Sequence, residues 1–311
     1  MKDFWASAGH TAKKLWSDDR FFGAILIAPL LIWLAVILVY PFMSVIWLGF
    51  TNAGVIGGRQ EFIGLENYRY LLSNPEFWDS LGKTAIWALG NALVQTILGL
   101  ALALSLNRPF RGQGVIRNWI ILPWIVPTVT TVVMWRWMLS GSFGVVNYVL
   151  VKLGVIEEMI SFLGQANVAM PAVTLINSWR WFPFITIIFL AGLQRIPKSE
   201  HEASLVDGAS ASQRFRFVTF PYLKPIMLLM GLLGILWSVN TFDVIWLSTQ
   251  GGPGSATETL ALLIYDVGFK RLQMGRGAAL SVLFFLIMIG FSVLYAYLNL
   301  RKDAGIFREP E

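Results

Sequence analysis

The sequence has no cysteine and only two histidines, His10 and His201, among its 311 residues. The absence of cysteine excludes disulfide bonds and thiolate metal sites, and two histidines argue against a histidine-based metal centre or proton relay. Charged residues are also scarce, because they make up 14% of the chain, against about a quarter in a typical soluble domain. We therefore expect neither a soluble protein nor a metal site.

Motifs of covalent catalysis are missing as well, since neither HExxH nor GxSxG occurs. The stretch 192–199 has the spacing of a phosphate-binding loop, but Pro197 stands where the second glycine belongs. Proline offers neither the flexibility nor the backbone N–H group that such a loop needs. We therefore predict no catalytic residue and no cofactor bound by this chain, which would not itself be an enzyme.

Apolar residues, by contrast, are abundant: 56% of the chain is hydrophobic and the mean hydropathy is +0.63. A helix needs ~20 mostly apolar residues to cross the hydrocarbon core of a bilayer. Six runs reach that length, and they cover residues 21–46, 82–106, 116–139, 169–193, 226–248 and 276–300. We predict an all-α integral membrane protein with six transmembrane helices in a lipid bilayer.

These helices would form one domain over residues 21–300, between a segment 1–20 and a tail 301–311.

Lysine and arginine are concentrated on one side of the predicted spans. Fifteen of them fall in segments 1–20, 107–117, 194–225 and 301–311, whereas five fall in segments 51–81, 140–168 and 249–275. The positive-inside rule then places both termini in the cytoplasm. The net charge of +6 reflects this topology, and no basic patch with stacking aromatics indicates nucleic-acid binding.

The cytoplasmic segment 194–225 is too polar to lie within the hydrocarbon, and its pattern predicts a helix–turn–helix. Each helix would open with a capping box, S-x-x-E at Ser199 and S-x-x-Q at Ser210. The pair Asp207-Gly208 between them predicts the turn, because glycine readily adopts a positive φ. Pro221 is expected to stop the second helix.

The second of these helices presents phenylalanines among arginines, at Phe215, Phe217 and Phe220. An exposed apolar ridge with a basic border is a plausible docking surface for another protein. The same pattern also fits an amphipathic helix that lies on the inner leaflet. The residue pattern alone leaves both interpretations open.

The segment also resembles the EAA loop of the permease subunits of binding-protein-dependent ABC importers. That loop reads roughly E-A-A-x-x-x-G and, about nine residues later, hydrophobic-x-L-P. This chain departs from it mildly, with Ser204 in place of an alanine and Phe220 in place of the leucine. The resemblance implies that a cytoplasmic ATPase contacts this loop, through Glu202, Ala203, Ser204, Asp207, Gly208, Ala209 and Pro221.

The resemblance extends to residues 99–127, 178–197 and 248–269, and the GGP motif at 251–253 is similar to that of the first permease in sugar and glycerol-phosphate systems. It implies a location in the bacterial cytoplasmic (inner) membrane. It also implies four kinds of partner: a second homologous permease, two ATPase subunits that bind ATP and Mg, an extracytoplasmic solute-binding protein, and a carbohydrate-like solute.

Polar residues inside predicted membrane helices indicate a solute pathway, because they are costly in hydrocarbon. The fifth span carries Trp237, Asn240, Thr241 and Asp243. Amides and carboxylates bind sugar hydroxyls, and indole rings stack on sugar faces. Arg180 in the fourth span could contact an anionic solute, or could pair with Asp243 or with backbone carbonyls to hold the fold.

An ATP-driven importer permease for a sugar or sugar-like solute is therefore the leading hypothesis. An ion-coupled secondary transporter is the alternative, and it would require carboxylates or histidines in the spans, where only Asp243 is a candidate. The choice between a sugar, a polyol, glycerol phosphate and a sulfonated sugar stays open.

Overall fold

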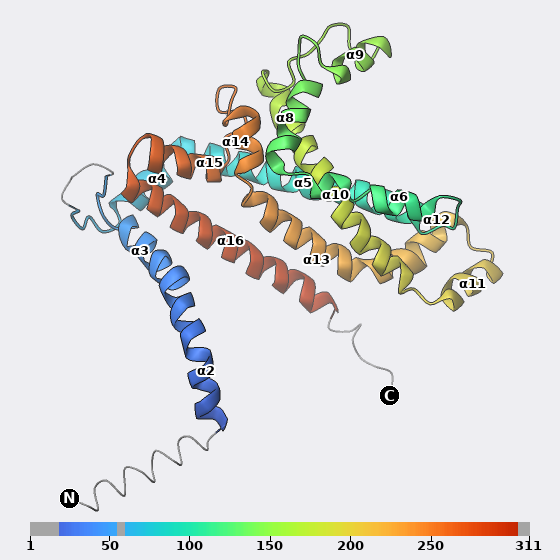
Figure 1. The fold of residues 1–311 in the computed structure, drawn as a ribbon, viewed down its shortest axis with the longest axis horizontal. Helices are drawn as coiled ribbons and strands as arrows, with labels where there is room; N and C mark the ends of the chain where they lie inside the picture. Colours follow the sequence, from blue (N-terminus) through green and yellow to red (C-terminus); the bar gives the residue numbers. More distant parts are fainter. Residues whose placement is uncertain (1–18, 55–59, 304–311) are drawn as a thin grey trace, which may run out of the picture.

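The computed structural model describes residues 19–54 and 60–303, and this part of the chain is helical (Figure 1). Within it, the only β pairing is an isolated bridge between Thr51 and Phe62. Five helices are long and apolar enough to cross a membrane, and they cover Leu26–Gly49, Pro75–Leu106, Ala166–Gln194, Ala211–Val239 and Met274–Asn299. The predicted all-α membrane fold is confirmed for the described residues.

The elements of the N-terminal half are α2 (Asp19–Leu34), the π-helical turn η1 (Ala35–Val39), α3 (Tyr40–Gly49), α4 (Glu66–Ser73), α5 (Pro75–Leu106), α6 (Gln113–Trp119), α7 (Leu122–Ile125), α8 (Thr128–Met138) and α9 (Val145–Lys152). Those of the C-terminal half are α10 (Ala166–Gln194), α11 (Lys198–Val206), α12 (Ala211–Arg214), the π-helical turn η2 (Phe215–Thr219), α13 (Phe220–Val239), α14 (Asp243–Thr249), α15 (Leu260–Tyr265), the π-helical turn η3 (Asp266–Lys270) and α16 (Met274–Asp303).

Helices α5, α10 and α13 form the centre of the bundle, where α5 packs closely along α10 (Figure 1). The close approach depends on Gly99 of α5. A Cβ atom at that position would lie 2.8 Å from Ile185 Cγ2 and 3.3 Å from the backbone nitrogen of Thr186, both on α10. Glycine is therefore required for the observed packing, as small residues are at many membrane helix interfaces.

A buried amide network joins α5 to α10 near the middle of both helices. The side-chain oxygen of Asn91 accepts hydrogen bonds from Asn177 Nδ2 at 2.7 Å, Ser178 Oγ at 3.2 Å and Gln95 Nε2 at 3.2 Å. All four side chains are almost completely buried. Because an unpaired polar group in such surroundings is costly, these bonds fix the register of the two helices.

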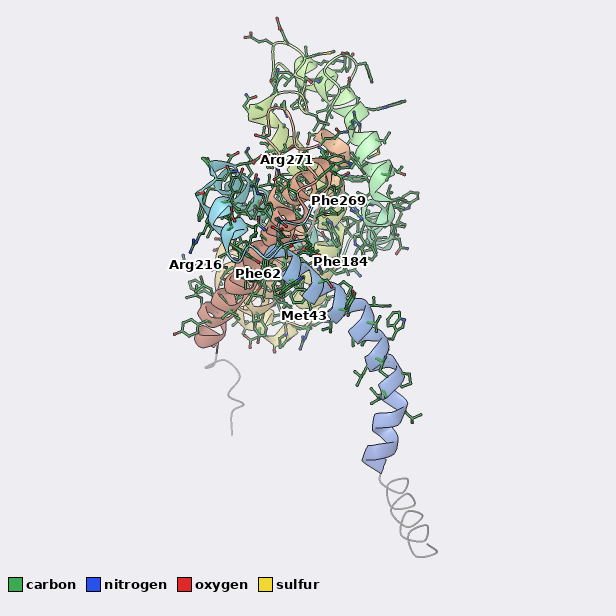
Figure 2. The ribbon with its side chains drawn as sticks, turned by 90° about the vertical axis from the view of Figure 1, so that its left-hand side faces the viewer. Met43, Phe62, Phe184, Arg216, Phe269 and Arg271 are labelled. Carbon is green, nitrogen blue, oxygen red and sulfur yellow. The ribbon has the colours of Figure 1, made fainter. Side chains whose placement is uncertain are left out.

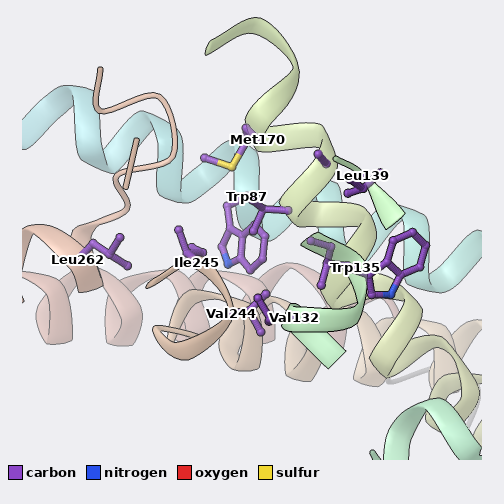
Figure 3. Close-up of a cluster of buried hydrophobic side chains, with 11 residues drawn as sticks. Trp87, Val132, Trp135, Leu139, Met170, Val244, Ile245 and Leu262 are labelled. Atoms are coloured by element: carbon purple, nitrogen blue, oxygen red, sulfur yellow. The ribbon is translucent and has the colours of Figure 1, made fainter. Parts of the chain in front are cut away.

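Trp87 anchors a second contact, between α5 and the end of α13. Its indole is fully buried and donates a hydrogen bond of 2.7 Å to the backbone oxygen of Ser238. Figure 3 shows Trp87 between Met170 and Ile245 in a cluster that gathers side chains from α5, α8, α10, α14 and α15. This cluster therefore positions α14 against the central helices.

The predicted third span, residues 116–139, is not one continuous helix. Its chain runs through α6 and α7 and then turns by 96° into α8. Val126 at the turn is extended, with ψ 130°, because a residue that precedes a proline, here Pro127, is disfavoured in helical conformation. The six predicted spans are therefore confirmed only in part, because the described residues hold five such helices, or six if the bent pair counts as one.

The predicted fifth span, residues 226–248, is also wrong in its boundaries. Helix α13 ends at Val239, and α14 begins only at Asp243. At the other end, Pro221 does not stop the preceding helix, because the chain is helical from Ala211 to Val239. The π-turn η2 accommodates the proline within the helix. It widens the helix just before Pro221, where the N–H of Phe220 bonds to the oxygen of Phe215.

The first span stands partly apart from the other helices. Figures 1 and 2 show α3 lying against α16 and α2 extending away from the bundle. The ring of Phe42 packs edge-on against Phe285 of α16, with centroids 5.0 Å apart. Farther from the bundle, Leu30 and Trp33 of α2 are more than half exposed, as expected of a helix that a bilayer surrounds.

We predict that Gly99→Ala destabilises the protein, because the new methyl group would force α5 and α10 apart. Overpacking of this kind costs about 1–3 kcal/mol, and thermal unfolding in detergent should show a lower midpoint. Gly82→Ala in the same helix is the matched control, since a Cβ at Gly82 meets nothing within 4 Å. An equal midpoint for both variants would contradict the proposed close contact.

Candidate functional site: a helix–turn–helix and a break in a membrane helix

The helix–turn–helix predicted in segment 194–225 is present, with α11 as its first helix. The turn is closed by Gly208, whose φ is +71°, a conformation that favours glycine. The N–H of Ala209 bonds back to the oxygen of Ser204 at 3.0 Å, and the Ala209 oxygen accepts from Arg214 Nη1 at 2.7 Å. These bonds hold the second helix at a fixed angle to α11.

One of the two predicted capping boxes is confirmed and the other is wrong. Ser210 caps α12, since its hydroxyl accepts from the N–H of Gln213 and its own N–H donates to Gln213 Oε1 at 2.8 Å. Helix α11 instead begins after Pro197, so Ser199 lies inside the helix and caps nothing. Proline fixes its own φ near the helical value, which lets the helix start two residues earlier.

The predicted coupling residues divide into an exposed set and a packed one. Glu202, Ala203, Asp207 and Pro221 are exposed, whereas Ser204 is buried and its hydroxyl donates to the oxygen of His201 at 2.7 Å. The serine that replaces the usual alanine is therefore satisfied within its own helix. The exposed residues remain free to contact another molecule.

Sequence reasoning missed an apolar tip on α11. Val206 is 88% exposed and Leu205 is 59% exposed, directly before the turn. On the second helix, Phe217 is 69% exposed, with the guanidinium of Arg216 over its ring. Figure 1 places α11 and α12 together at one end of the bundle. A polar helix–turn–helix with an apolar tip is a surface suited to binding a protein.

The second set of predicted residues lies where α13 breaks. Arg180 Nη1 of α10 is 4.0 Å from Asp243 Oδ2 at the start of α14, so of the alternatives for Arg180 this distance favours the pairing with Asp243. The carboxylate side chain is 51% exposed and the arginine side chain 22%. Arg180 Nε is buried without a hydrogen-bond partner. The pair leaves the break with little net charge.

Aromatic rings continue from this ion pair along α10 and α13. The guanidinium of Arg180 lies 5.8 Å from the ring centre of Trp181, and Trp181 stacks on Trp237 at 5.2 Å. Phe184 meets Trp237 edge-on at 5.8 Å and stacks with Trp124 of α7 at 5.7 Å. The sequence analysis had named only Trp237 of this group. Aromatic residues one turn apart in α10 are the signal that could have found the others.

Asn240 and Thr241 occupy the break itself. Asn240 Nδ2 donates to the oxygen of Leu236 at 2.7 Å, and Thr241 Oγ1 donates to the oxygen of Trp237 at 2.9 Å. Their side chains thus satisfy carbonyl groups that lose their helical partners where α13 ends. Asn240 is nevertheless exposed, so its amide can also meet a solute.

At the end of the bundle that carries α4 and α15, Arg271 links η3 to the start of α5. It bonds to both carboxylate oxygens of Glu76 and, through Nε, to Asp266 Oδ2 at 2.6 Å. The hydrogen bond to Glu76 is the main reason why the pKa of Arg271 is raised. Burial raises the pKa of Glu258, and the charges of Glu76 and Asp266 raise it further.

A cavity of about 1040 Å³ lies between α8, the chain on either side of α9, and the end of α14. None of the predicted pathway residues lines it, although Asp243 begins the helix whose last residues do. No group of three or more histidine, aspartate or glutamate residues that could hold a metal ion occurs in the described part of the chain.

The family model described as "Binding-protein-dependent transport system inner membrane component" matches residues 95–303. The chain is 36% identical over 282 residues to the trehalose/maltose transport system permease protein of Thermococcus litoralis, an alignment that covers 91% of this chain and 95% of that protein. It is 35% identical over 291 residues to the sulfoquinovosyl glycerol transport system permease protein of Agrobacterium fabrum, covering 93% and 94%.

Solved structures agree with this fold. A chain of the bacterial alginate ABC transporter, in complex with alginate pentasaccharide-bound periplasmic protein, matches with a TM-score of 0.79 and 20% identity, and the match covers 94% of this chain and 98% of that chain. The family match spans both the helix–turn–helix and the break after α13. The chain therefore belongs to the family of inner membrane components of binding-protein-dependent transport systems, as its EAA-like loop had indicated.

Proposed function

We propose that this chain is the permease subunit of an ATP-driven importer, and that it passes a sugar or sugar-like solute delivered by an extracytoplasmic binding protein. The family membership is the observation that supports a transport function. The names of the relatives support the solute class, since they concern trehalose and maltose, and sulfoquinovosyl glycerol. The chain performs no chemistry itself, so ATP and Mg would be bound by separate ATPase subunits.

The helix–turn–helix would be the site where an ATPase subunit docks. Its turn is held by Gly208 and Ser210, and its tip exposes Leu205 and Val206 beside Glu202. A rigid projection transmits movement better than a flexible loop, because little of the displacement is lost in local deformation. When ATP closes the ATPase dimer, the displaced turn would move α10 and α13 and so bias the bundle between two openings.

The distribution of lysine and arginine supports a cytoplasmic position for this end of the bundle and for both termini. The full assembly would contain a second homologous permease, two ATPase subunits and the solute-binding protein. An ATPase pair requires two docking sites, and this chain offers one EAA-like loop over 202–221. The second permease would supply the other.

The break after α13 would line the solute pathway. Asn240 is exposed there beside the Arg180–Asp243 pair, and Trp181 and Trp237 form a stacked apolar face next to it. This combination offers hydrogen bonds to hydroxyl groups and a flat surface for a sugar ring. An ion-coupled transporter is not favoured, because Asp243, the one carboxylate that the sequence offered for it, is paired with an arginine.

At the turn of the helix–turn–helix, Gly208→Val should release the ATPase subunits from the purified complex. Valine at φ +71° is strained by about 1 kcal/mol or more, so the two helices should lose their fixed angle. The measurement is the amount of ATPase that copurifies with the tagged chain in mild detergent, read by mass spectrometry.

Gly154→Val is the matched control for this experiment. Gly154 also has a positive φ, +69°, and open space around it, but it lies after α9, outside the helix–turn–helix. It should suffer the same strain and keep its ATPase. Full ATPase recovery with Gly208→Val, or equal loss in both variants, would reject the proposed docking site.

At the break after α13, Asn240→Ala should lower solute uptake by about tenfold, because one hydrogen bond to the solute is worth ~1.4 kcal/mol. Basal ATPase activity of the complex should persist, since the helix–turn–helix is untouched. Asn118→Ala on the exposed surface of α6 is the control. Normal uptake by Asn240→Ala would exclude the residue from the pathway.

Asp243 requires a different design because it is paired. Asp243→Ala alone leaves Arg180 without its carboxylate and should lower the thermal midpoint, since an unpaired, largely buried charge is destabilising. The double variant Arg180→Ala/Asp243→Ala should recover stability but not uptake. Recovery of both would mean that the ion pair holds the fold and takes no part in transport.

A further inference from the structure

Fully buried polar residues behind the lining hold the walls of the cavity beside α8 in place. Asn147 of α9 is completely buried, and its Nδ2 donates to the oxygens of Ser140 at 2.9 Å and Ile160 at 2.8 Å. Its Oδ1 accepts from the N–H of Ile160 at 2.9 Å. One amide therefore holds together the two chain segments that form this wall, and the wall needs no ligand to keep its shape.

The opposite wall is the GGP turn, whose role the importer function leaves unassigned. Thr257 is completely buried, and its hydroxyl donates to the oxygen of Gly252 at 2.8 Å while its N–H bonds to the oxygen of Gly251 at 3.0 Å. Arg136 of α8 joins the two walls, since its Nη1 donates to the oxygen of Leu247 at 3.3 Å. The cavity is thus preformed, which lowers the entropy lost on binding.

The lining combines hydroxyl and amide groups with two exposed rings. Ser142, Gln165 and Gln250 face the cavity, and Trp137 and Phe143, which also line it, are 69% and 70% exposed. Among the described residues that line the cavity, none carries a carboxylate, and the one charged residue is an arginine. Such a lining does not suit a cation, and it offers a polyhydroxylated molecule both donors and flat apolar faces.

Ser248 also lines the cavity, but its hydroxyl oxygen is buried beneath the surface and has no hydrogen-bond partner among the described residues.

We propose that this cavity is a second saccharide-binding site, separate from the Arg180–Asp243 pair and reached by the solute at a different stage of transport. The inference rests on the proposed function and extends it. Helix α14 connects the two sites, since it begins at Asp243 and Ser248 lies near its other end. The volume of about 1040 Å³ is at the upper end of the ~300–1,000 Å³ usual for ligand pockets, so the site fits an oligosaccharide better than a monosaccharide.

The cysteine-free chain permits a direct test with single cysteines. Gln165→Cys and Gln250→Cys would be placed in the cavity and Val155→Cys, at an exposed position that does not line it, would serve as the control. Each variant is purified with its partner subunits, reconstituted into phosphatidylethanolamine–phosphatidylglycerol vesicles and alkylated with N-ethylmaleimide. Trehalose, maltose and maltotriose are supplied with the binding protein, and alkylation of this chain is followed by mass spectrometry.

The saccharide that raises ATPase activity should slow alkylation at both cavity positions by about fivefold or more, as expected when a bound ligand covers them, and should leave Val155→Cys unchanged. Adding Trp137→Ala should raise the saccharide concentration for half protection about three- to tenfold, because a stacked ring is lost. Trp119→Ala, at an exposed tryptophan of α6, should not change it.

Four results would overturn the inference. If a saccharide raises ATPase activity but protects neither cavity cysteine, the importer stands and this site falls. If the binding protein protects them equally without saccharide, the cavity receives a protein loop instead. If Trp137→Ala releases the second permease during purification, the cavity belongs to a subunit interface. If no saccharide raises ATPase activity, the proposed function itself fails, and this site falls with it.

Discussion

The side-chain oxygen of Asn91 is the point on which the packing of the central helices depends. Three donors from two helices meet at this one atom, and all of the side chains involved are buried. Within hydrocarbon the alternative to each bond is an unsatisfied polar group, so the relative position of α5 and α10 is fixed far more sharply than apolar contact could fix it. Gly99 and Trp87 then set the spacing of α5 from α10 and from α13.

The same constraint explains why the chain can interrupt its membrane helices without losing stability. Where α13 ends, the oxygens of Leu236, Trp237 and Ser238 accept from side chains of Asn240, Thr241 and Trp87. Where a proline interrupts the helical hydrogen bonding, a π-turn or an extended residue before it accommodates the lack of a proline N–H group. The breaks are therefore stable features, and they place polar groups between the long helices, where the proposed function requires a solute pathway.

Helix α10 connects the two groups of residues to which we assign roles. Its C-terminal end leads into the helix–turn–helix, with its left-handed glycine and its exposed tip, and Arg180 in its middle pairs with Asp243. The buried amide network ties α10 to α5 at Asn177 and Ser178, next to Arg180. Under the proposed function, a displacement of the helix–turn–helix by a docked ATPase would travel along α10 to the Arg180–Asp243 pair.

Local composition, backbone preferences and motifs of fixed spacing are enough to predict the all-α membrane fold, the turn at Gly208, the cap at Ser210 and the family. They do not reveal that a π-turn accommodates Pro221 within a helix, or that the span 116–139 bends by 96°. The choice of Asp243 as the partner of Arg180, the contact of Asn91 with Asn177, and the cavity between α8 and the GGP turn depend on tertiary packing. These features unite residues that are far apart in the chain, and no local preference specifies which of them meet.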